Sequence, residues 1–375
     1  MSSPFVYGKV VENQHFVGRE KELSQLSSNL VYQKNTLMLA LRGQGKSTLL
    51  KKAATAARSR DYQLRICMLS LAKVSTMERF CSEYAKAVIK ATSKNLEEAV
   101  SSVRRYLKDT CPVMAAEATD IDGFTLAFES HDTKEIIGSV IELPEFIAKD
   151  KNLKVVVCID DFHRFFDIAE ASSFLEILDQ CWCGHKNASY CICADRTEQI
   201  ERISKSFRLF KEASQVIELE NIPPSVFVDY IRNTFADTGK YIDDGAASLL
   251  VDLVGGHPHY VQQLAQLSWL RTSVVCPEDV VREAHQSMVD QMALVFKTLT
   301  ESFTSQQLCY LRAVLCGETV ISSTEVLHRY GISSATSASR SKAALIDRNI
   351  ITAFKGKVLF LDPVYACWLK TKYFK

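Results

Sequence analysis

The stretch ALRGQGKST, residues 40–48, follows the apolar run TLML of residues 36–39 and opens a helical pattern that continues to about Ala57. An apolar strand, a glycine-containing turn and a helix in this order predict a phosphate-binding loop, because the turn and the helix N-terminus point backbone N–H groups at an anion. In such a loop Lys46 reaches the β and γ phosphates of a nucleotide, and Ser47 places its hydroxyl on Mg²⁺. This loop decides the fold, because it joins a strand and a helix of a parallel α/β sheet.

Ala40 departs from the pattern G-x-x-x-x-G-K-[ST], which has glycine at this first position. A methyl group is tolerated at the end of a strand if φ is negative, whereas Gly45 must let the backbone approach the phosphate. We therefore expect the substitution to be compatible with nucleotide binding. Taken alone, the loop has an alternative interpretation as a glycine-rich surface turn.

Two adjacent carboxylates follow a second apolar strand, VVVCI at residues 155–159. Ligands of open α/β sheets bind at the carboxyl ends of the strands, which is where this strand delivers Asp160 and Asp161. Asp160 is placed to hold Mg²⁺ through water, and Asp161 to orient or deprotonate an attacking water. The alternative interpretation is a solvated turn after a core strand.

Strand-like and helical patterns alternate from residue 35 onward, which is typical of βαβ units and a parallel sheet covered on both faces. The predicted strands are NTLMLAL, QLRICMLSL, KVVVCI and ASYCICA, and helices follow at residues 46–57, 77–91, 169–179 and 198–206. An insertion at about residues 111–150 interrupts the alternation. It reads as a hairpin around Asp122 and Gly123, within residues 113–130, followed by a helix at 135–150.

The second half of the chain changes character after the strand-like QVIEL at residues 215–219. Pro223 and Pro224 mark a boundary, and a helical region follows through about Thr300. Three short helical patterns and two strand-like pieces then predict a winged helix-turn-helix. These elements cover residues 304–314, 323–330, 335–348, 350–354 and 357–362. The predicted domains are an N-terminal arm (1–16), an α/β core (17–220), a helical lid (221–300) and a winged helix (301–375).

The composition agrees with several folded domains, since 375 residues exceed one ordinary core and 47% are apolar. A formal net charge of +1 gives no overall electrostatic reason to expect nucleic acid or an anionic membrane as partner. The first residues lack a secretory signal and no run is long and apolar enough to span a membrane, so we expect a cytoplasmic protein with no membrane partner. Its twelve cysteines are expected to be reduced, and many of them buried.

Four segments resemble, in order and spacing, the archaeal-type ATPase family, an AAA+-like branch related to the signal-transduction (STAND) NTPases. They are PFVYGKVVENQHFVGREKEL, LRGQGKSTLL, LPEFIAKDKNLKVVVCIDDFHRF and GGHPHYVQQLA. The resemblance extends over nearly the whole chain and includes a C-terminal winged helix that ends in DPVYACWLK. It implies a P-loop NTPase with a parallel sheet flanked by helices, a helical lid and a winged helix, which binds ATP and Mg²⁺.

The resemblance also implies which residues form the site. The adenine side is assigned to Phe16, Val17, Gly18 and Pro258, and the phosphate side to Arg42, Gly43, Gln44, Gly45, Lys46, Ser47 and Thr48. Ser47 and Asp160 correspond to the metal-binding positions. Asp161 corresponds to the catalytic acid, and Arg196, after the strand ASYCICAD, to the arginine that senses the γ-phosphate. The family loop often reads G-P-R-R-x-G-K-T, so Ala40, Leu41 and Gly43 differ from it, whereas Arg42, Gly45 and Lys46 agree.

Asp161 stands where the archaeal family usually has glutamate, although STAND proteins often show a D-D pair. Because aspartate is one methylene shorter, its carboxylate falls short of the usual water position by ~1 Å, a misplacement that can cost ~10²-fold in rate. We therefore expect slow hydrolysis, which suits a nucleotide-dependent conformational switch. The sequence identifies no trans-acting arginine, and Arg202 and Arg208 are only candidates.

Two other functions stay open. The first is an ATP-regulated DNA-binding protein, because residues 331–375 carry eight basic and two acidic residues. Arg340 and Lys342 lie on the candidate recognition helix, and Lys355 and Lys357 at the wing. That helix is rich in Ser and Ala, however, and winged helices also bind proteins. The second is a degenerate site in a protein-interaction scaffold. A protein partner or a second copy of the chain is possible in each case.

A zinc site is a weaker alternative. Thiolates and imidazole are suitable ligands, and they are present at Cys181, Cys183, His185, Cys191 and Cys193. The C-x-C spacing is too short for a usual zinc motif, so we expect these cysteines to pack in the core. The pair His257 and His259 lacks an H-E-x-x-H frame and is not expected to bind metal.

Overall fold

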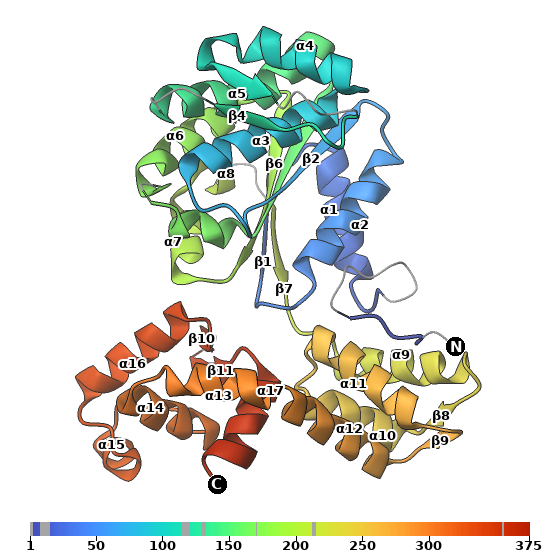
Figure 1. Ribbon diagram of the computed structural model, residues 1–375, viewed down its shortest axis with the longest axis vertical. Coiled ribbons are helices and arrows are strands. Elements are labelled where there is room, and N and C mark those ends of the chain that lie inside the picture. Colours follow the sequence, from blue (N-terminus) through green and yellow to red (C-terminus); the bar gives the residue numbers. More distant parts are fainter. Residues whose placement is uncertain are drawn as a thin grey trace. The chain divides into compact units, whose positions relative to one another are not determined.

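The computed structural model describes residues 3–7, 16–114, 120–128, 133–169, 171–211, 215–354 and 356–375. The chain divides into two compact units (Figure 1). The core unit is Arg19–Glu220, and the C-terminal unit consists of Met1–Gly18 and Asn221–Lys375. The four domain ranges predicted from the sequence are a different partition and stay predictions. Much of the predicted N-terminal arm, residues 8–15, lies outside the described residues.

A five-stranded parallel sheet forms the centre of the core unit, which confirms the predicted fold class. Its strands follow the order β2 (Leu64–Ser70), β5 (Lys154–Asp160), β6 (Ala188–Asp195), β1 (Thr36–Ala40) and β7 (Gln215–Leu219). Every residue of β1 is buried, as are nearly all residues of β5 and β6. Burial on both faces explains why these strands are continuous apolar runs in the sequence.

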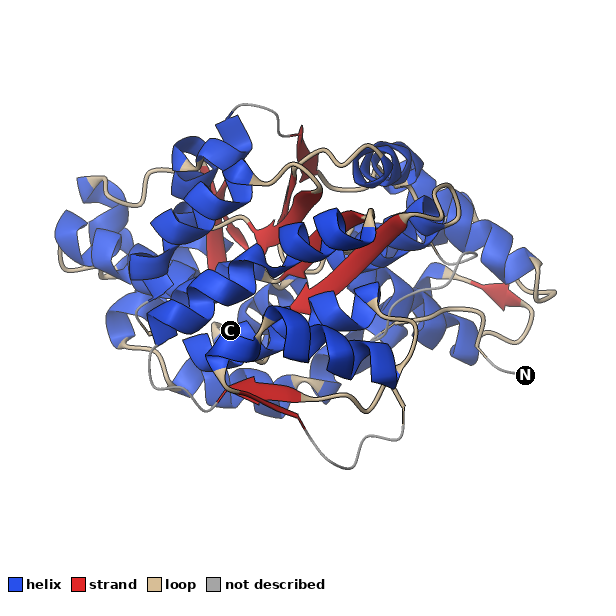
Figure 2. Ribbon diagram, turned by 90° about the horizontal axis from the view of Figure 1, so that it is seen from above, coloured by secondary structure: helices blue, strands red, loops and turns tan. Residues whose placement is uncertain are grey.

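Helices cover both faces of this sheet (Figures 1 and 2). On one side lie α1 (Glu20–Val31) and α2 (Lys46–Arg58). On the other side lie α3 (Met77–Thr92), α4 (Leu96–Tyr106), α5 (Thr133–Lys151) and α6 (Ala171–Gly184), and α7 (Glu198–Ser206) and α8 (Arg208–Lys211) complete the unit. Helices α1 and α4 were not predicted from the sequence.

Helix α3 shows how the local sequence builds this layer. The Thr76 side chain accepts the backbone N–H of Arg79 at 3.2 Å and so caps the helix N-terminus. Phe80, Tyr84 and Val88 recur every four residues, lie on one face and are completely buried in the same core as β1 and β5. The capped, one-sided pattern therefore fixes both the start of the helix and the face that it buries.

The predicted insertion contains the expected hairpin. Strands β3 (Pro112–Met114) and β4 (Leu126–Phe128) pair antiparallel, and Met114 is opposite Leu126. This register places Asp122 and Gly123 in the connection between the two strands of the predicted hairpin. The predicted hairpin includes residues 115–119 and 129–130, which lie outside the described residues.

The C-terminal unit is helical from α9 (Pro224–Ala236) through α10 (Asp244–Leu253), α11 (Pro258–Arg271), α12 (Glu278–Gln291) and α13 (Ala293–Glu301). Two short strands that the sequence did not predict, β8 (Tyr241–Ile242) and β9 (Val275–Cys276), pair parallel beside these helices. The winged helix follows with α14 (Ser305–Leu315), α15 (Thr324–Tyr330), α16 (Ala335–Asp347), β10 (Ile351–Phe354) and β11 (Lys357–Phe360), and α17 (Pro363–Trp368) precedes a π-helical turn at Leu369–Tyr373. The helical lid and winged helix are confirmed.

One hydrophobic core joins the lid and the winged helix within the C-terminal unit. It extends from Phe5, whose ring lies edge-on to Tyr230 at 6.0 Å and tilted against Phe235 at 5.7 Å, to Leu369. Residues near the N-terminus therefore belong to the same packed unit as the C-terminal helices. No helix among the described residues is long and apolar enough to cross a membrane.

Candidate functional site

Strand β1 delivers the predicted phosphate loop to the carboxyl edge of the sheet. Ala40 is the last residue of the strand and is 2% exposed. Its φ angle is not positive. Its carbonyl accepts the backbone N–H of Arg196 at 3.0 Å, so Ala40 has ordinary strand geometry. The expectation that a methyl is sterically acceptable at this position is met by the backbone.

Glycine is required later in the loop. Gly43 has φ +80° and Gly45 has φ +86°, both in the left-handed region that favours glycine. Gly45 forms the N-cap of α2, and a Cβ built there meets no atom within 4 Å. The backbone at Gly45 thus borders open space at a helix N-terminus, which is the arrangement that receives an anion. Arg42 beside it is exposed, and Thr48 in the first turn of the helix is half-buried.

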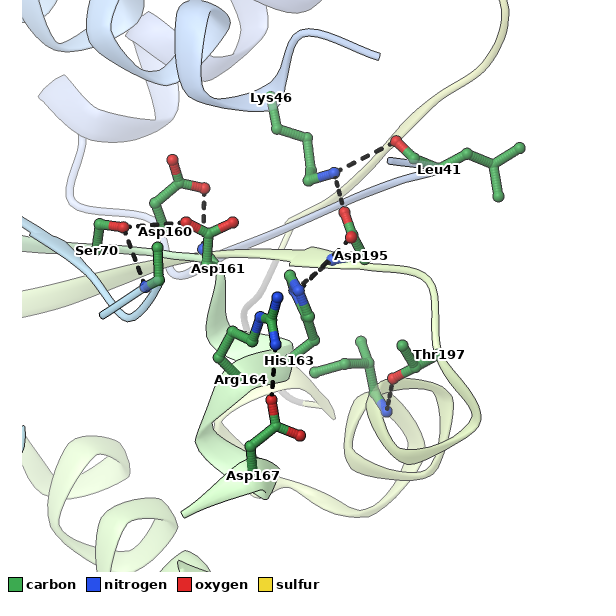
Figure 3. A network of polar contacts seen from close by, with 12 residues as sticks. Leu41, Lys46, Ser70, Asp160, Asp161, His163, Arg164, Asp167, Asp195 and Thr197 are labelled. Atoms are coloured by element: carbon green, nitrogen blue, oxygen red, sulfur yellow. Dashed lines mark hydrogen bonds and ion pairs between the residues drawn. The ribbon is translucent and has the colours of Figure 1, made fainter. Parts of the chain in front are cut away.

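Lys46, the first residue of α2, lies over the end of the sheet and is 7% exposed. Its ammonium donates to the Leu41 carbonyl at 3.3 Å and forms an ion pair with Asp195, the last residue of β6 (Figure 3). The ion pair follows from the strand order, since β6 is the neighbour of β1 and Ala40 is opposite Asp195.

The two predicted metal ligands meet. The Ser47 side chain hydrogen-bonds to Asp160, which is 8% exposed at the end of β5. Burial raises the pKa of Asp160, and the hydrogen bond from Ser47 opposes this shift. A carboxylate and a hydroxyl are hard oxygen donors, and Mg²⁺ typically takes one or two protein oxygens and completes its shell with water and substrate phosphates. This pair therefore fits a Mg²⁺ site.

Asp161 adopts a left-handed conformation, with φ +58° and ψ +34°. This geometry starts the short 3₁₀ helix Phe162–Asp167 and directs the Asp161 carboxylate to Ser70 at the end of β2, whose hydroxyl donates to Oδ2 at 3.0 Å. The Asp161 N–H donates to Asp160 Oδ1 at 3.0 Å, so the two acids diverge from one backbone corner. Asp161 is half-buried and faces the edge where the loop lies (Figure 3).

Arg196 follows β6 directly, and its guanidinium pairs with Glu218 Oε2 on β7 at 2.5 Å. Strand β7 lies on the far side of β1 from β5, so this contact directs the arginine away from Asp160 and Asp161. Arg202 and Arg208, the candidates for a trans-acting arginine, are exposed on or beside α7. Their role stays a prediction.

Arg19 contacts the loop through the Gln44 side chain, a role that was not predicted from the sequence. It is 5% exposed and donates to the Glu220 carbonyl at 2.5 Å, to Glu22 at 3.1 Å and to the Gln44 side chain at 3.5 Å. Gln44 in turn donates its N–H to Leu41 at 3.4 Å, which closes the turn of the loop. A buried arginine therefore links the loop to the end of β7.

The structure also brings in His163, Asp195 and Ser70, which sequence reasoning missed. Asp195 and Ser70 end β6 and β2, so the argument that selected Asp160 at a strand end would have found both. His163 follows the two acids by two residues and had no motif to mark it.

The predicted adenine-side residues lie in the C-terminal unit. Phe16, Val17 and Gly18 are half-buried, and Gly18 has φ +65°. A Cβ on Gly18 would come within 2.7 Å of Ile222 Cγ2, so glycine is required by both conformation and space. Pro258 is the first residue of α11. Contact of these residues with adenine stays a prediction.

The structure gives no support to zinc. No group of three or more His, Cys, Asp or Glu side chains within the described ranges is arranged to hold a metal ion. Cys191 and Cys193 are completely buried in β6, and Cys67 and Cys158 are buried in neighbouring strands, as expected for core residues. His259 packs edge-on against Tyr7 at 5.7 Å, and its burial lowers the pKa of the imidazole.

Solved structures with a similar fold cover nearly the whole chain. A Walker-type ATPase of Pyrococcus abyssi is 14% identical, with a TM-score of 0.62 over 95% of this chain and 96% of that one. The Aeropyrum pernix ORC2 protein, solved in ADPNP–ADP complexes, is 12% identical, with a TM-score of 0.58 over 97% and 96%. The Aeropyrum pernix ORC1 protein, solved in complex with DNA, is 13% identical, with a TM-score of 0.52 over 100% and 99%. At these identities the likeness shows the fold.

A search of curated proteins gives no match to the sequence. A family description does match, and it covers residues 9–275, which include the loop, the two acids and the start of the lid. The matched range contains both members of the Ser47–Asp160 pair. The match covers more than half of the chain, which therefore belongs to the family described as novel STAND NTPase 1.

Proposed function

We propose that the chain binds ATP with Mg²⁺, hydrolyses it slowly and acts as a nucleotide-dependent conformational switch. The observation that carries the proposal is the hydrogen bond between Ser47 and Asp160. It joins the loop hydroxyl to the strand-end carboxylate beside the buried ammonium of Lys46. Each group has a use in binding a metal–triphosphate, and burying them together without such a ligand costs folding free energy.

Different groups of the core unit would bind the phosphates, the Mg²⁺ ion and the attacking water. The backbone N–H groups around Gly45 and the N-terminus of α2 receive phosphate oxygens, and Lys46 adds a positive charge. Ser47 and Asp160 would hold Mg²⁺, which supplies positive charge against the phosphates. Asp161 would accept a hydrogen bond from the attacking water. The residues predicted for adenine remain Phe16, Val17, Gly18 and Pro258.

Two contacts of the nucleotide-free chain support slow hydrolysis. The Asp161 carboxylate accepts the Ser70 hydroxyl at 3.0 Å, so a water must share or displace this hydrogen bond. Arg196 is paired with Glu218 at 2.5 Å and must leave this partner to reach a phosphate. A misplacement of about 1 Å at a catalytic group costs ~10²-fold in rate.

The test measures binding and turnover separately. We expect Lys46→Ala to weaken MgATP binding by about 10²-fold, because a charge-assisted contact is lost. Asp161→Asn should leave binding within about twofold and lower phosphate release. Lys51→Ala, an exposed lysine on the same helix, is the matched control and should change neither. Calorimetric titration and thermal melts provide the readouts.

Unchanged ATP affinity in Lys46→Ala, with a normal melt, contradicts the proposal. A wild-type melting temperature that does not respond to saturating MgATP or MgADP instead supports the degenerate scaffold. A switch further requires that the ATP- and ADP-bound chains differ in shape, which solution X-ray scattering measures.

We place this activity in the cytoplasm, because all twelve cysteines carry free thiols, as in a reducing compartment.

DNA binding is a second candidate, favoured by the surface of the winged helix. Arg340 and Lys357 are exposed on α16 and β11, Lys342 is half-buried, and no described carboxylate pairs with any of the three. Lys355 at the wing lies outside the described residues. The similar Aeropyrum pernix ORC1 protein was solved in complex with DNA, which makes the same role reasonable here.

The DNA test compares two charge reversals in the same unit. Arg340→Glu with Lys342→Glu should weaken duplex binding about tenfold or more and lower its salt dependence. Arg282→Glu with Lys297→Glu makes the same charge change on α12 and α13 and should have little effect. Fluorescence anisotropy at several salt concentrations measures both, and equal losses in the two variants contradict a specific DNA surface.

A further inference from the structure

Asp195 lies at the centre of the phosphate site without a role in the loop or the metal pair. It ends β6, which is flanked by β5 with Asp160 on one side and by β1 with the loop on the other. Its side chain is 15% exposed. A carboxylate in this position is electrostatically opposed to binding a triphosphate, so its presence requires an explanation.

One oxygen of Asp195 is committed to Lys46. The Oδ1 atom forms the ion pair with the lysine ammonium, whose side chain is 8% exposed. A charge pair that is mostly shielded from water interacts more strongly than an exposed pair. The ammonium that would contact phosphates is therefore paired with Asp195.

His163 holds Asp195 from the other side (Figure 3). Its Nδ1 accepts the Asp195 backbone N–H at 3.1 Å, so the neutral ring carries its proton on Nε2. That Nε2 faces Asp195 Oδ2 at 3.5 Å. Both ring nitrogens of His163 thus contact Asp195, one at its backbone N–H and the other at its carboxylate. The ring therefore restrains the backbone and the side chain of Asp195 together. Asp161, Lys46 and Arg164 are the other charged groups near the ring.

We propose that Asp195 is a positioning residue that holds Lys46 in place of a phosphate, and that His163 keeps Asp195 in that position. Nucleotide binding then requires the lysine to exchange its carboxylate partner for phosphate oxygens. The ion pair opposes this exchange and so lowers the affinity for nucleotide. The inference rests on the proposed nucleotide binding and adds a residue that sets its strength.

The experiment measures MgADP and MgATP binding to the full chain by calorimetric titration. Asp195→Asn keeps the side-chain shape and removes the charge, so we expect binding to tighten by about tenfold, equivalent to removing one shielded opposing contact. His163→Gln should tighten binding less, by about threefold, because Asp195 is retained but held less firmly. Asp167→Asn makes the same charge change on the exposed end of the 3₁₀ helix and should have no effect.

A second readout separates positioning from a merely structural ion pair. Asp195→Asn should lower the melting temperature of the nucleotide-free chain while enlarging the rise caused by MgADP. A structural role alone would lower the melting temperature and leave affinity unchanged or weaker, which overturns the inference.

The outcomes also separate this inference from the proposed function. If the wild-type chain binds nucleotide and Asp195→Asn binds it equally or more weakly, the inference fails and the proposed function stands. If neither chain binds nucleotide, both fail. If only Asp195→Asn binds measurably, the inference is supported and the wild-type chain is held in a low-affinity state.

Discussion

At the scale of single residues, the carboxyl edge of the sheet contains several groups that oppose folding. Asp161 holds a left-handed backbone at φ +58°, and Asp160 buries a carboxylate. Left-handed conformations of residues other than glycine cost free energy and concentrate at functional sites. Hydrogen bonds from neighbouring side chains hold both acids in place: Ser70 donates to Asp161, and Ser47 hydrogen-bonds to Asp160.

Asp160→Asn should therefore stabilise the nucleotide-free chain. Burial raises the pKa of Asp160, so the folded protein binds the carboxyl proton more tightly than the unfolded chain does, and ionisation at neutral pH costs folding free energy. The asparagine has no charge to bury. We expect the melting temperature at pH 7 to rise by about 2–4 °C for each kcal/mol recovered, and the rise to disappear as the pH falls through the raised pKa. Differential scanning calorimetry measures both.

Asp179 provides the contrasting control, because it is also buried but accepts backbone N–H groups from Arg208 and Leu209 with its two oxygens. An amide cannot accept with both atoms, so Asp179→Asn should lower the melting temperature. A fall for both variants would contradict the view that Asp160 is kept for binding rather than for stability.

The part of the site that the sequence predicts is the part that a motif encodes. Lys46, Ser47 and Asp160 were predicted from spacing and strand ends, and the last two are in contact. Asp195 and His163 were missed because their importance depends on β6 lying between β5 and β1, an order that no local pattern contains. Arg196 was selected instead of its neighbour Asp195, which forms the contact with Lys46.

At the scale of elements, capping residues explain which boundaries the sequence predicted well. Helix α7 begins at Glu198, as predicted, after Thr197 accepts the N–H of Ile200 at 3.3 Å. In the winged helix, Thr304 and Gln307 form a capping box that starts α14. Strands β8 and β9 have two residues each, too few to show any alternation, and so were not predictable.

Phe5 anchors the N-terminal residues to the C-terminal unit and gives an element-scale prediction. The ring is 2% exposed against Tyr230 and Phe235 on α9. Phe5→Ala should lower the free energy of unfolding by about 3 kcal/mol, the lower end for a buried phenylalanine, because the short segment can relax. Urea denaturation followed by circular dichroism measures the loss. Tyr7→Ala, at a residue that is 37% exposed, should cost clearly less, and equal losses would contradict the anchoring role.

At the scale of the whole molecule, two separate cores organise the chain. One core lies around the sheet of the core unit, and the other joins the lid, the winged helix and Phe5. The alternation of strands and helices was enough to predict the parallel sheet. The order of three helices followed by a hairpin was enough to predict the winged helix. That the lid and the winged helix share one core was not predictable, because periodicity shows that a helix buries a face but not which partner it meets.

The core unit contains every residue proposed to contact phosphate or Mg²⁺, whereas the predicted adenine residues belong to the C-terminal unit. A protein of residues 19–220 should therefore fold with its own cooperative transition, because it retains a complete core. It should bind Mg²⁺–tripolyphosphate about as tightly as the full chain does. Circular dichroism melts establish the fold, and calorimetric titration measures the affinity.

ATP should behave differently from tripolyphosphate in this comparison. If Phe16, Val17, Gly18 and Pro258 contact the base, the full chain gains binding free energy from adenine that residues 19–220 lack, and its ATP affinity should be higher by about tenfold or more. Lys46→Met should weaken tripolyphosphate binding by a similar factor of about 10²-fold in both proteins, because the phosphate contacts are the same in each. Equal ATP affinity in a folded core unit and the full chain would contradict the adenine assignment while leaving the phosphate site intact. Loss of tripolyphosphate binding from a folded core unit would contradict the phosphate site itself.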